Sequence, residues 1–218
     1  MYLLDSDVAR KMAQYILIDD MVACLGCRLA DLAVLPQLKF QLGIGTAKAL
    51  RKLGNEAAVA AANKLIDAAQ EISLGPEAAN TLLGLNRPDI DSGEQVLFAA
   101  LLLDVSRQMV SGDKRAMVAL SQIETIEHVW ASLRCLEDLV LLMVHAMAFD
   151  TLSANIRGRA DADISLSIIF GRSQAAPKAS VLEALGSYLN QLINDTGGRY
   201  VISGRLGRVC GQCSHQSL

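Results

Sequence analysis

Three acidic residues stand where the sequence predicts the end of a strand or the start of a helix. Asp5 ends a short apolar run at the N-terminus, and Asp113 follows the apolar run 107–111. Glu94 lies in the first turn of the helix predicted over 94–103. Because the carboxyl ends of parallel strands meet at one edge of a sheet, we expect these carboxylates to share a crevice, although they lie far apart in the chain.

Crowded carboxylates point to a specific chemistry. They repel one another, and their pKa values rise unless a divalent ion neutralises them. Hard oxygen ligands favour Mg²⁺ or Mn²⁺, and such a site hydrolyses phosphodiesters by activating water and stabilising the charge that develops on the phosphate. Asp5, Glu94 and Asp113 are therefore the candidate catalytic and metal-binding residues, with Asp7 and Asp91 as further candidate ligands.

The elements that would position these acids follow an α/β pattern. Four segments are predicted as strands, the last one completing the sheet: 2–4, 31–36, 107–111 and 199–203. Apolar residues recur at helical spacing between them, over 8–25, 37–42, 47–53, 56–72, 94–103, from 116 onward and over most of 126–194. The chain is thus predicted to form an α/β domain over 1–125 and a helical extension over 126–218.

Composition and charge exclude several classes of protein. With 52% hydrophobic residues the 218-residue chain can bury a sizeable core, which excludes a disordered protein. Its net charge of −3 means that any polyanion must be bound by a local group of cations. Aromatic residues make up only 4%, too few for a large base-stacking platform. The N-terminus lacks the pattern of a signal peptide, so we expect a cytoplasmic protein.

The apolar run 129–149 is long enough to suggest a membrane span. It contains Arg134, Glu137, Asp138 and His145, which would be costly in lipid. We therefore predict a buried helix here and no membrane association.

Four of the five cysteines form two C-x-x-C pairs, Cys24 with Cys27 and Cys210 with Cys213. Four thiolates, or three with His215, could hold Zn²⁺. The first pair has an apolar setting, so buried, inert thiols are the alternative.

Three short segments together resemble the PIN domain nucleases. Residues 2–8 (YLLDSDV) look like the first strand of that family with its first metal acid, residues 93–100 (GEQVLFAA) are similar to its acidic helix, and residues 110–116 (VSGDKRA) look like its last acidic segment. The resemblance implies a three-layer α/β fold with a central, mostly parallel sheet, to which this chain adds C-terminal helices. It also departs from the family, because many members carry a further acid in a region that here contains Gln37 and Gln41.

The resemblance implies roles for the neighbouring residues as well. Ser111 would support Asp113, and Lys114 and Arg115 would bind substrate phosphates. Arg157 and Arg159 are candidates for a second patch that binds the nucleic-acid backbone. By analogy with the family we expect RNA rather than DNA as the substrate, a bacterial toxin–antitoxin setting with a protein regulator, and a homodimer.

Two other functions fit parts of the sequence. The Asp5-x-Asp7 pair also resembles haloacid dehalogenase-type phosphatases, in which the first aspartate is the nucleophile and the second the acid/base. A non-catalytic PIN-like interaction protein would explain the missing acid. The nuclease and phosphatase readings place important residues at the end of the first strand, whereas the interaction protein is supported by the missing acid and the apolar run from Val129.

Overall fold

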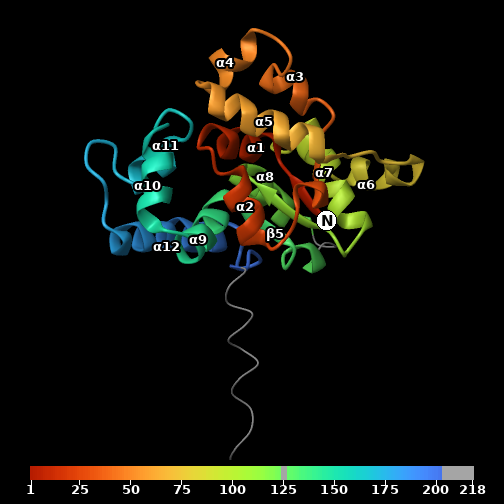
Figure 1. The fold of residues 1–218 in the computed structure, drawn as a ribbon. Coiled ribbons are helices and arrows are strands. Elements are labelled where there is room, and N and C mark those ends of the chain that lie inside the picture. Colours follow the sequence, from red (N-terminus) through yellow and green to blue (C-terminus); the bar gives the residue numbers. More distant parts are fainter. Residues whose placement is uncertain (124–126, 203–218) are drawn as a thin grey trace, which may run out of the picture.

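Five short strands run parallel in a central sheet within the residues that the computed structural model describes, 1–123 and 127–202 (Figure 1). They lie in the order β3-β2-β1-β4-β5. Their bounds are β1 (Tyr2–Leu4), β2 (Leu32–Val34), β3 (Gln70–Glu71), β4 (Gln108–Ser111) and β5 (Leu133–Cys135). The chain thus starts in the middle of the sheet, adds two strands on one side, and returns to add two on the other.

This strand order creates a switch point between β1 and β4. Leu4 of β1 is in register with both Val34 of β2 and Val110 of β4. The connections that leave β1 and β4 turn to different sides of the sheet, which opens a crevice at their carboxyl ends. Asp5 and Asp113 lie at this place.

Helices cover both faces of the sheet. Their bounds are α1 (Ser6–Gln14), α2 (Ile18–Leu25), α3 (Leu38–Leu42), α4 (Lys48–Leu53), α5 (Glu56–Ala68), α6 (Ala79–Gly84), α7 (Ser92–Leu103), α8 (Lys114–Ser121), α9 (Leu136–Ala146), α10 (Phe149–Arg157), α11 (Ile164–Ile169) and α12 (Lys178–Asp195). In Figure 1, α3 and α4 lie beyond α5 and α1, and α10, α11 and α12 gather on one side of the molecule.

The side chains of each strand point alternately to the two faces of the sheet, which divides the core into two layers. Leu4 packs in a cluster with residues of α1, α2, α5 and α9, and its neighbour Leu3 packs with residues of α7 and α8. Successive side chains of a strand point to opposite faces, so a sheet buried on both sides produces this division. The predicted three-layer α/β architecture is therefore correct at the level of layers and class.

One predicted helix is broken. The apolar spacing over 8–25 suggested a single helix, but the structure has α1 and α2 with a turn between them. Ile16 in this turn has φ of 58°, a left-handed conformation that is uncommon for a β-branched residue. The spacing fits both helices because each buries its own apolar side in the same core cluster.

Two strands were missed, β3 and β5. The predicted helices over 56–72 and 129–149 extend through them; in the structure α5 ends before β3, and the run 129–149 divides between the end of a 3-10 turn (Glu127–Val129), β5 and α9. Strands of two or three residues carry too little alternation to be recognised. Since β5 pairs with β4, Cys135 opposite Ser111, the sheet continues past the predicted domain boundary at 125.

The predicted last strand is also wrong over its described part. Residues 199–202 carry no strand, and residue 203 lies outside the described residues. Instead, the buried Tyr200 hydroxyl accepts a hydrogen bond from the Cys135 backbone N–H at 2.9 Å and donates one to Asp138 Oδ2 at 3.2 Å. The Tyr200 side chain, rather than a sixth strand, therefore satisfies the backbone N–H of Cys135 at the end of β5.

No helix within the described residues combines the length and apolar composition needed to cross a bilayer. Charged residues of the run 129–149 are used inside the protein, since Glu137 and Asp138 are buried in the first turn of α9.

Candidate functional site

A hollow of about 470 Å³ opens at the carboxyl ends of β1 and β4. Five carboxylates line this hollow, those of Asp5, Asp7, Asp91, Glu94 and Asp113. The other lining residues are Ser6, Gly112, Lys114 and Arg115. The three acids that the sequence analysis singled out thus lie around one pocket. Asp7 and Asp91 lie there too.

Asp5 occupies the junction of β1 and α1. It is the N-cap of α1, where its Oδ1 accepts a long hydrogen bond of 3.4 Å from the Asp7 backbone N–H. Its Oδ2 accepts a hydrogen bond from the Gly112 N–H at 3.0 Å. Burial raises the pKa of Asp5, although these two N–H groups act in the opposite direction.

Asp113 occupies the equivalent place after β4. It caps α8, with Oδ1 accepting hydrogen bonds from the backbone N–H groups of Arg115 at 2.8 Å and Ala116 at 3.1 Å. The Ser111 hydroxyl accepts one from the Asp113 N–H at 3.2 Å. Ser111 is completely buried, so it supports the loop that carries Asp113 and does not line the pocket as a substrate-binding residue.

Glu94 and Asp91 hold each other at the start of α7. Asp91 Oδ1 accepts a hydrogen bond from the Glu94 N–H and Glu94 Oε2 accepts one from the Asp91 N–H, both at 2.8 Å. This capping box is a local sequence pattern. Through this capping box, α7 contributes two acids to the crevice between the ends of β1 and β4.

Five acidic side chains and two cations line the pocket, so negative charge is in excess there. Glu94 is only 7% exposed. Burial, and then repulsion from Asp113, Asp91 and Asp5, raises the pKa of Glu94 to about 8. A cation in the pocket would relieve this repulsion, and hard carboxylate oxygens suit Mg²⁺ or Mn²⁺.

The carboxylates are not arranged around a single point. Among the described residues, no three His, Cys, Asp or Glu side chains stand in an arrangement that would hold a metal ion. The physical reason is that Asp5, Glu94 and Asp113 each direct oxygens at backbone N–H groups. The chemistry of the donor set fits a divalent cation, and side-chain rotation would be needed to bring the oxygens together.

Asp7 differs from the other acids of the pocket because it is paired with two cations. It forms salt bridges with Arg10 and with Lys11, the latter at 2.5 Å. Burial alone would raise the pKa of Asp7, but hydrogen bonds and charge from Lys11 and Arg10 hold it below its ordinary value. Asp7 is therefore less suited than Asp91 to act as a further metal ligand.

Two of the predicted phosphate-binding cations lie at the rim of the pocket. The Lys114 ammonium is 2.5 Å from Glu137 Oε1 and 4.8 Å from the centre of the Tyr188 ring. Arg115 is 84% exposed, and its guanidinium is 3.6 Å from Asp113 Oδ2. Arg115 is thus the cation that can reach a bound phosphate with the least rearrangement.

Arg157 and Arg159 are not brought to this site. Arg157 lines a different hollow, beside Phe149 and Lys178, and its Nε donates to the Gly171 carbonyl at 2.8 Å. Arg159 pairs with Asp161 at 2.9 Å and donates to the Leu53 carbonyl. Both guanidinium groups bind loop backbone or a neighbouring acid, so the predicted second patch does not form at the acidic pocket.

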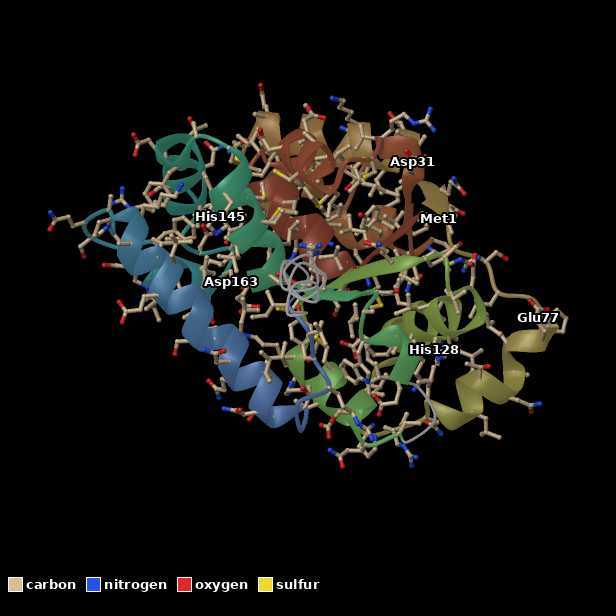
Figure 2. All side chains as sticks on the ribbon, turned by 90° about the horizontal axis from the view of Figure 1, so that it is seen from below. Met1, Asp31, Glu77, His128, His145 and Asp163 are labelled. Atoms are coloured by element: carbon tan, nitrogen blue, oxygen red, sulfur yellow. The ribbon has the colours of Figure 1, made fainter. Side chains whose placement is uncertain are left out.

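The histidines also lie elsewhere. Figure 2 shows His128 and His145 well apart, the latter on α9 near the C-terminal helices. Neither lines the acidic pocket.

The cysteine pairs give no metal centre within the described residues. Cys24 and Cys27 are partly buried free thiols, and Cys210 and Cys213 lie outside the described residues. Burial, followed by the charges of nearby Asp20 and Asp31, raises the pKa values of Cys24 and Cys27 respectively.

Sequence reasoning missed two features beside the pocket. Glu137 lies just after β5, and its Oε2 is buried without a hydrogen-bond partner among the described residues. Glu137, like Asp5, follows a short apolar run, a pattern that could have identified it. The sequence instead predicts a helix over the run that precedes Glu137. The second feature is a hollow of about 130 Å³ that adjoins the acids and is lined by Gln37 and Gln41.

No protein-family model, curated protein or solved structure matches this chain.

Proposed function

We propose that this protein is a metal-dependent hydrolase of phosphodiester bonds, a PIN-like endoribonuclease that uses Mg²⁺ or Mn²⁺. One observation carries the proposal: Asp5, Glu94 and Asp113 come from three separate elements and line the same pocket. Each acid alone is explained by its part in a helix N-cap or a capping box. Capping does not require the starts of three helices to meet at one pocket.

Asp5, Glu94 and Asp113 would hold the cation, with Asp91 beside them. When bound, a divalent cation stabilises negative charge on a phosphate and lowers the pKa of water. The carboxylates have no need to form a covalent bond with the substrate. The raised pKa of Glu94, caused first by burial and then increased by repulsion from Asp113, Asp91 and Asp5, is typical of a carboxyl group at a functional site.

Lys114 and Arg115 would meet the substrate backbone at the rim. A net charge of −3 gives the protein as a whole no attraction for RNA. Cations placed next to the acids therefore have to position the phosphate.

The ion pairs of Asp7 favour this function over a phosphatase. A haloacid dehalogenase-type mechanism would use Asp7 as its acid/base, and that role needs a carboxyl whose pKa is near or above its ordinary value. Arg10 and Lys11 act in the opposite direction on Asp7.

The test combines cleavage with metal binding. Asp5→Asn, Glu94→Gln and Asp113→Asn are each expected to reduce Mn²⁺-dependent cleavage of single-stranded RNA by about 10²- to 10³-fold, the loss typical of one electrostatic group at a reacting phosphate or carbonyl. Calorimetric titration should show weaker Mn²⁺ binding in the same variants. Glu183→Gln, on an exposed position of α12 far along the chain, is the matched control and should behave as the wild type.

Three results would contradict the proposal. Cleavage that persists unchanged in all three variants would mean that the pocket is not the active site. Wild-type protein that binds Mn²⁺ no better than Asp5→Asn would favour a non-catalytic interaction protein. A phosphoryl-aspartate adduct on Asp5 would favour the phosphatase.

A further inference from the structure

The short helix α3 divides sharply into a buried and an exposed side. Leu38 and Leu42 are buried, whereas Gln37, Phe40 and Gln41 are exposed. Residues spaced by three and four positions lie on the same side of a helix. Two amides and one aromatic ring therefore share the outer side of α3.

Phe40 is unusually exposed for its type. At 78% it is the most exposed large hydrophobic side chain among the described residues, so its ring contributes little to the core. The side-chain amides of Gln37 and Gln41 have no hydrogen-bond partner within the described part of the chain. Nothing in the fold of this segment uses these three side chains.

The same two amides line the small hollow beside the acids. Gln37 and Gln41 form its wall together with Asp5, Asp91 and Glu94, and its volume is about 130 Å³. An α-helix, about 10 Å in diameter, is too wide for it. A single planar ring is the kind of group that a hollow of this size admits.

Gly93 packs closely against two residues that line this hollow. A Cβ on Gly93 would lie 3.0 Å from Leu35 Cδ1 and 3.3 Å from Asp91 Oδ1, whereas its distance of 3.7 Å from Gln37 Nε2 is an ordinary contact. A larger residue would therefore crowd Leu35 and Asp91.

The carboxylates thus stand between two different surfaces. On one side are the amides of the small hollow, and on the other are Lys114 and Arg115 at the rim of the main pocket. A strand of RNA lying across the acids would meet amides with one part and cations with the next. This arrangement assigns bases to the first side and phosphates to the second.

We propose that Gln37, Phe40 and Gln41 form a nucleobase-binding site that selects the base next to the scissile phosphate. The inference rests on the nuclease function proposed above and adds a specificity to it. Single-stranded RNA is recognised by stacking of bases on aromatic rings and by hydrogen bonds to their edges. Phe40, on the exposed side of α3 and outside the lining of the hollow, would supply the ring. The glutamine amides that line the hollow would supply donors and acceptors, which match adenine best.

The experiment measures binding without requiring cleavage. Fluorescence anisotropy, in Ca²⁺, would compare a labelled single-stranded oligoadenylate with an oligonucleotide of the same length made of abasic sites. Phe40→Ala should weaken oligoadenylate binding roughly 5- to 150-fold, the range for loss of one stacked base. Phe40→Leu should lose nearly as much, because it keeps the apolar volume but not the ring. Neither variant should change binding of the abasic oligonucleotide.

The amides are tested by base preference. Gln37→Ala with Gln41→Ala should reduce the preference for oligoadenylate over oligouridylate, again by roughly 5- to 150-fold. Leu83→Ala, at another side chain that is 74% exposed, is the matched control and should leave all binding unchanged. Thermal unfolding of each variant should match the wild type, since the substituted side chains are exposed.

Three results would overturn the base-binding site: equal binding of oligoadenylate by wild type and Phe40→Ala, full binding by Phe40→Leu, or no binding of any oligonucleotide by the wild type. The first two would favour a protein partner on this side of α3. Comparison of two variants distinguishes failure of the base-binding site from failure of the proposed nuclease function. If Asp113→Asn leaves Mn²⁺-dependent cleavage unchanged while Phe40→Ala loses oligoadenylate binding, the base site stands and the catalytic assignment fails; the reverse pattern leaves the nuclease and removes the base site.

Discussion

The Asp5 carboxylate accepts a hydrogen bond from the backbone N–H of Gly112 at 3.0 Å, which ties the end of β1 to the loop that follows β4. This bond joins residues 107 positions apart. The absence of a side chain at Gly112 lets this loop approach Asp7 closely, because a Cβ on Gly112 would lie 2.8 Å from Asp7 Oδ2. Asp7 has little freedom to move away, since Arg10 and Lys11 hold it.

Gly112→Ala is therefore expected to disturb the pocket. The added methyl should displace the loop or Asp7 at a cost of about 1–3 kcal/mol in the free energy of unfolding, as for other overpacked sites. Urea denaturation measures this cost, and Mn²⁺ titration should show weaker binding because Asp113 moves with the loop. Gly84→Ala, where a Cβ meets nothing within 4 Å, should leave Mn²⁺ binding unchanged. Equal Mn²⁺ binding by Gly112→Ala and the wild type would mean that the Asp5 to Gly112 contact does not shape the site.

The raised pKa of Glu94 predicts a dependence of stability on pH. Its value is about 8 in the folded protein against 4.5 for an unperturbed glutamate, and burial is the first cause. The folded state therefore binds the proton more tightly than the unfolded state. The stability that this group contributes is fully present below pH 4.5 and is lost as the pH rises through about 8.

Glu94→Gln should remove this part of the pH dependence, because the amide is neutral at every pH and can still accept the Asp91 N–H. Thermal unfolding between pH 5 and 8 in a metal chelator measures it. In the wild type, Mn²⁺ should reverse the loss, since a cation favours the ionised carboxylate. Identical pH profiles for wild type and Glu94→Gln would contradict the prediction.

Arg115 is expected to bind a substrate phosphate, and its contribution should depend on salt. Arg115→Ala should weaken RNA binding and reduce the slope of log affinity against log salt concentration by about 0.7, the value for one phosphate contact to a single strand. Arg157→Ala is the control, because Arg157 bonds a carbonyl away from the pocket. Anisotropy titrations across a range of KCl concentrations measure both. A slope that falls in Arg157→Ala and not in Arg115→Ala would place the nucleic acid elsewhere.

Lys11 joins the first helix to the C-terminal helices. Its ammonium lies 2.5 Å from Asp7 and 2.6 Å from Asp163, the N-cap of α11, with only 11% of its side chain exposed. Figure 2 shows Asp163 on the side of those helices. Lys11→Met would leave two carboxylates without their shared cation, which should cost about 3–5 kcal/mol.

Urea denaturation measures that cost. Lys64→Met removes the exposed pair with Asp19 and should cost no more than about 1 kcal/mol. Asp163→Asn in the Lys11→Met background should recover part of the loss by removing one unpaired charge. A cost for Lys11→Met as small as that for Lys64→Met would show that the buried pair does not hold the two parts together.

Local patterns in the sequence determined the positions of the acids. Asp5 and Asp113 could be located because each follows a short apolar run and precedes a helical pattern, which is a property of a few consecutive residues. The caps themselves lie one or two residues away from the predicted ones: the sequence predicts Ser6 or Asp7 and Ser92, whereas Asp5 and Asp91 cap α1 and α7. The class of the fold could also be predicted, since strands and helices alternate along the chain. These features depend on neighbours in sequence and are therefore readable from it.

Only the tertiary structure decided which residues meet across long distances. It paired Asp7 with Lys11, kept Arg157 and Arg159 away from the pocket, and made β5 from three residues that the sequence assigns equally well to a helix. A three-residue strand exists because β4 offers it hydrogen bonds, and an ion pair forms because packing brings its partners together. Such outcomes depend on contacts between distant segments, which no local pattern contains.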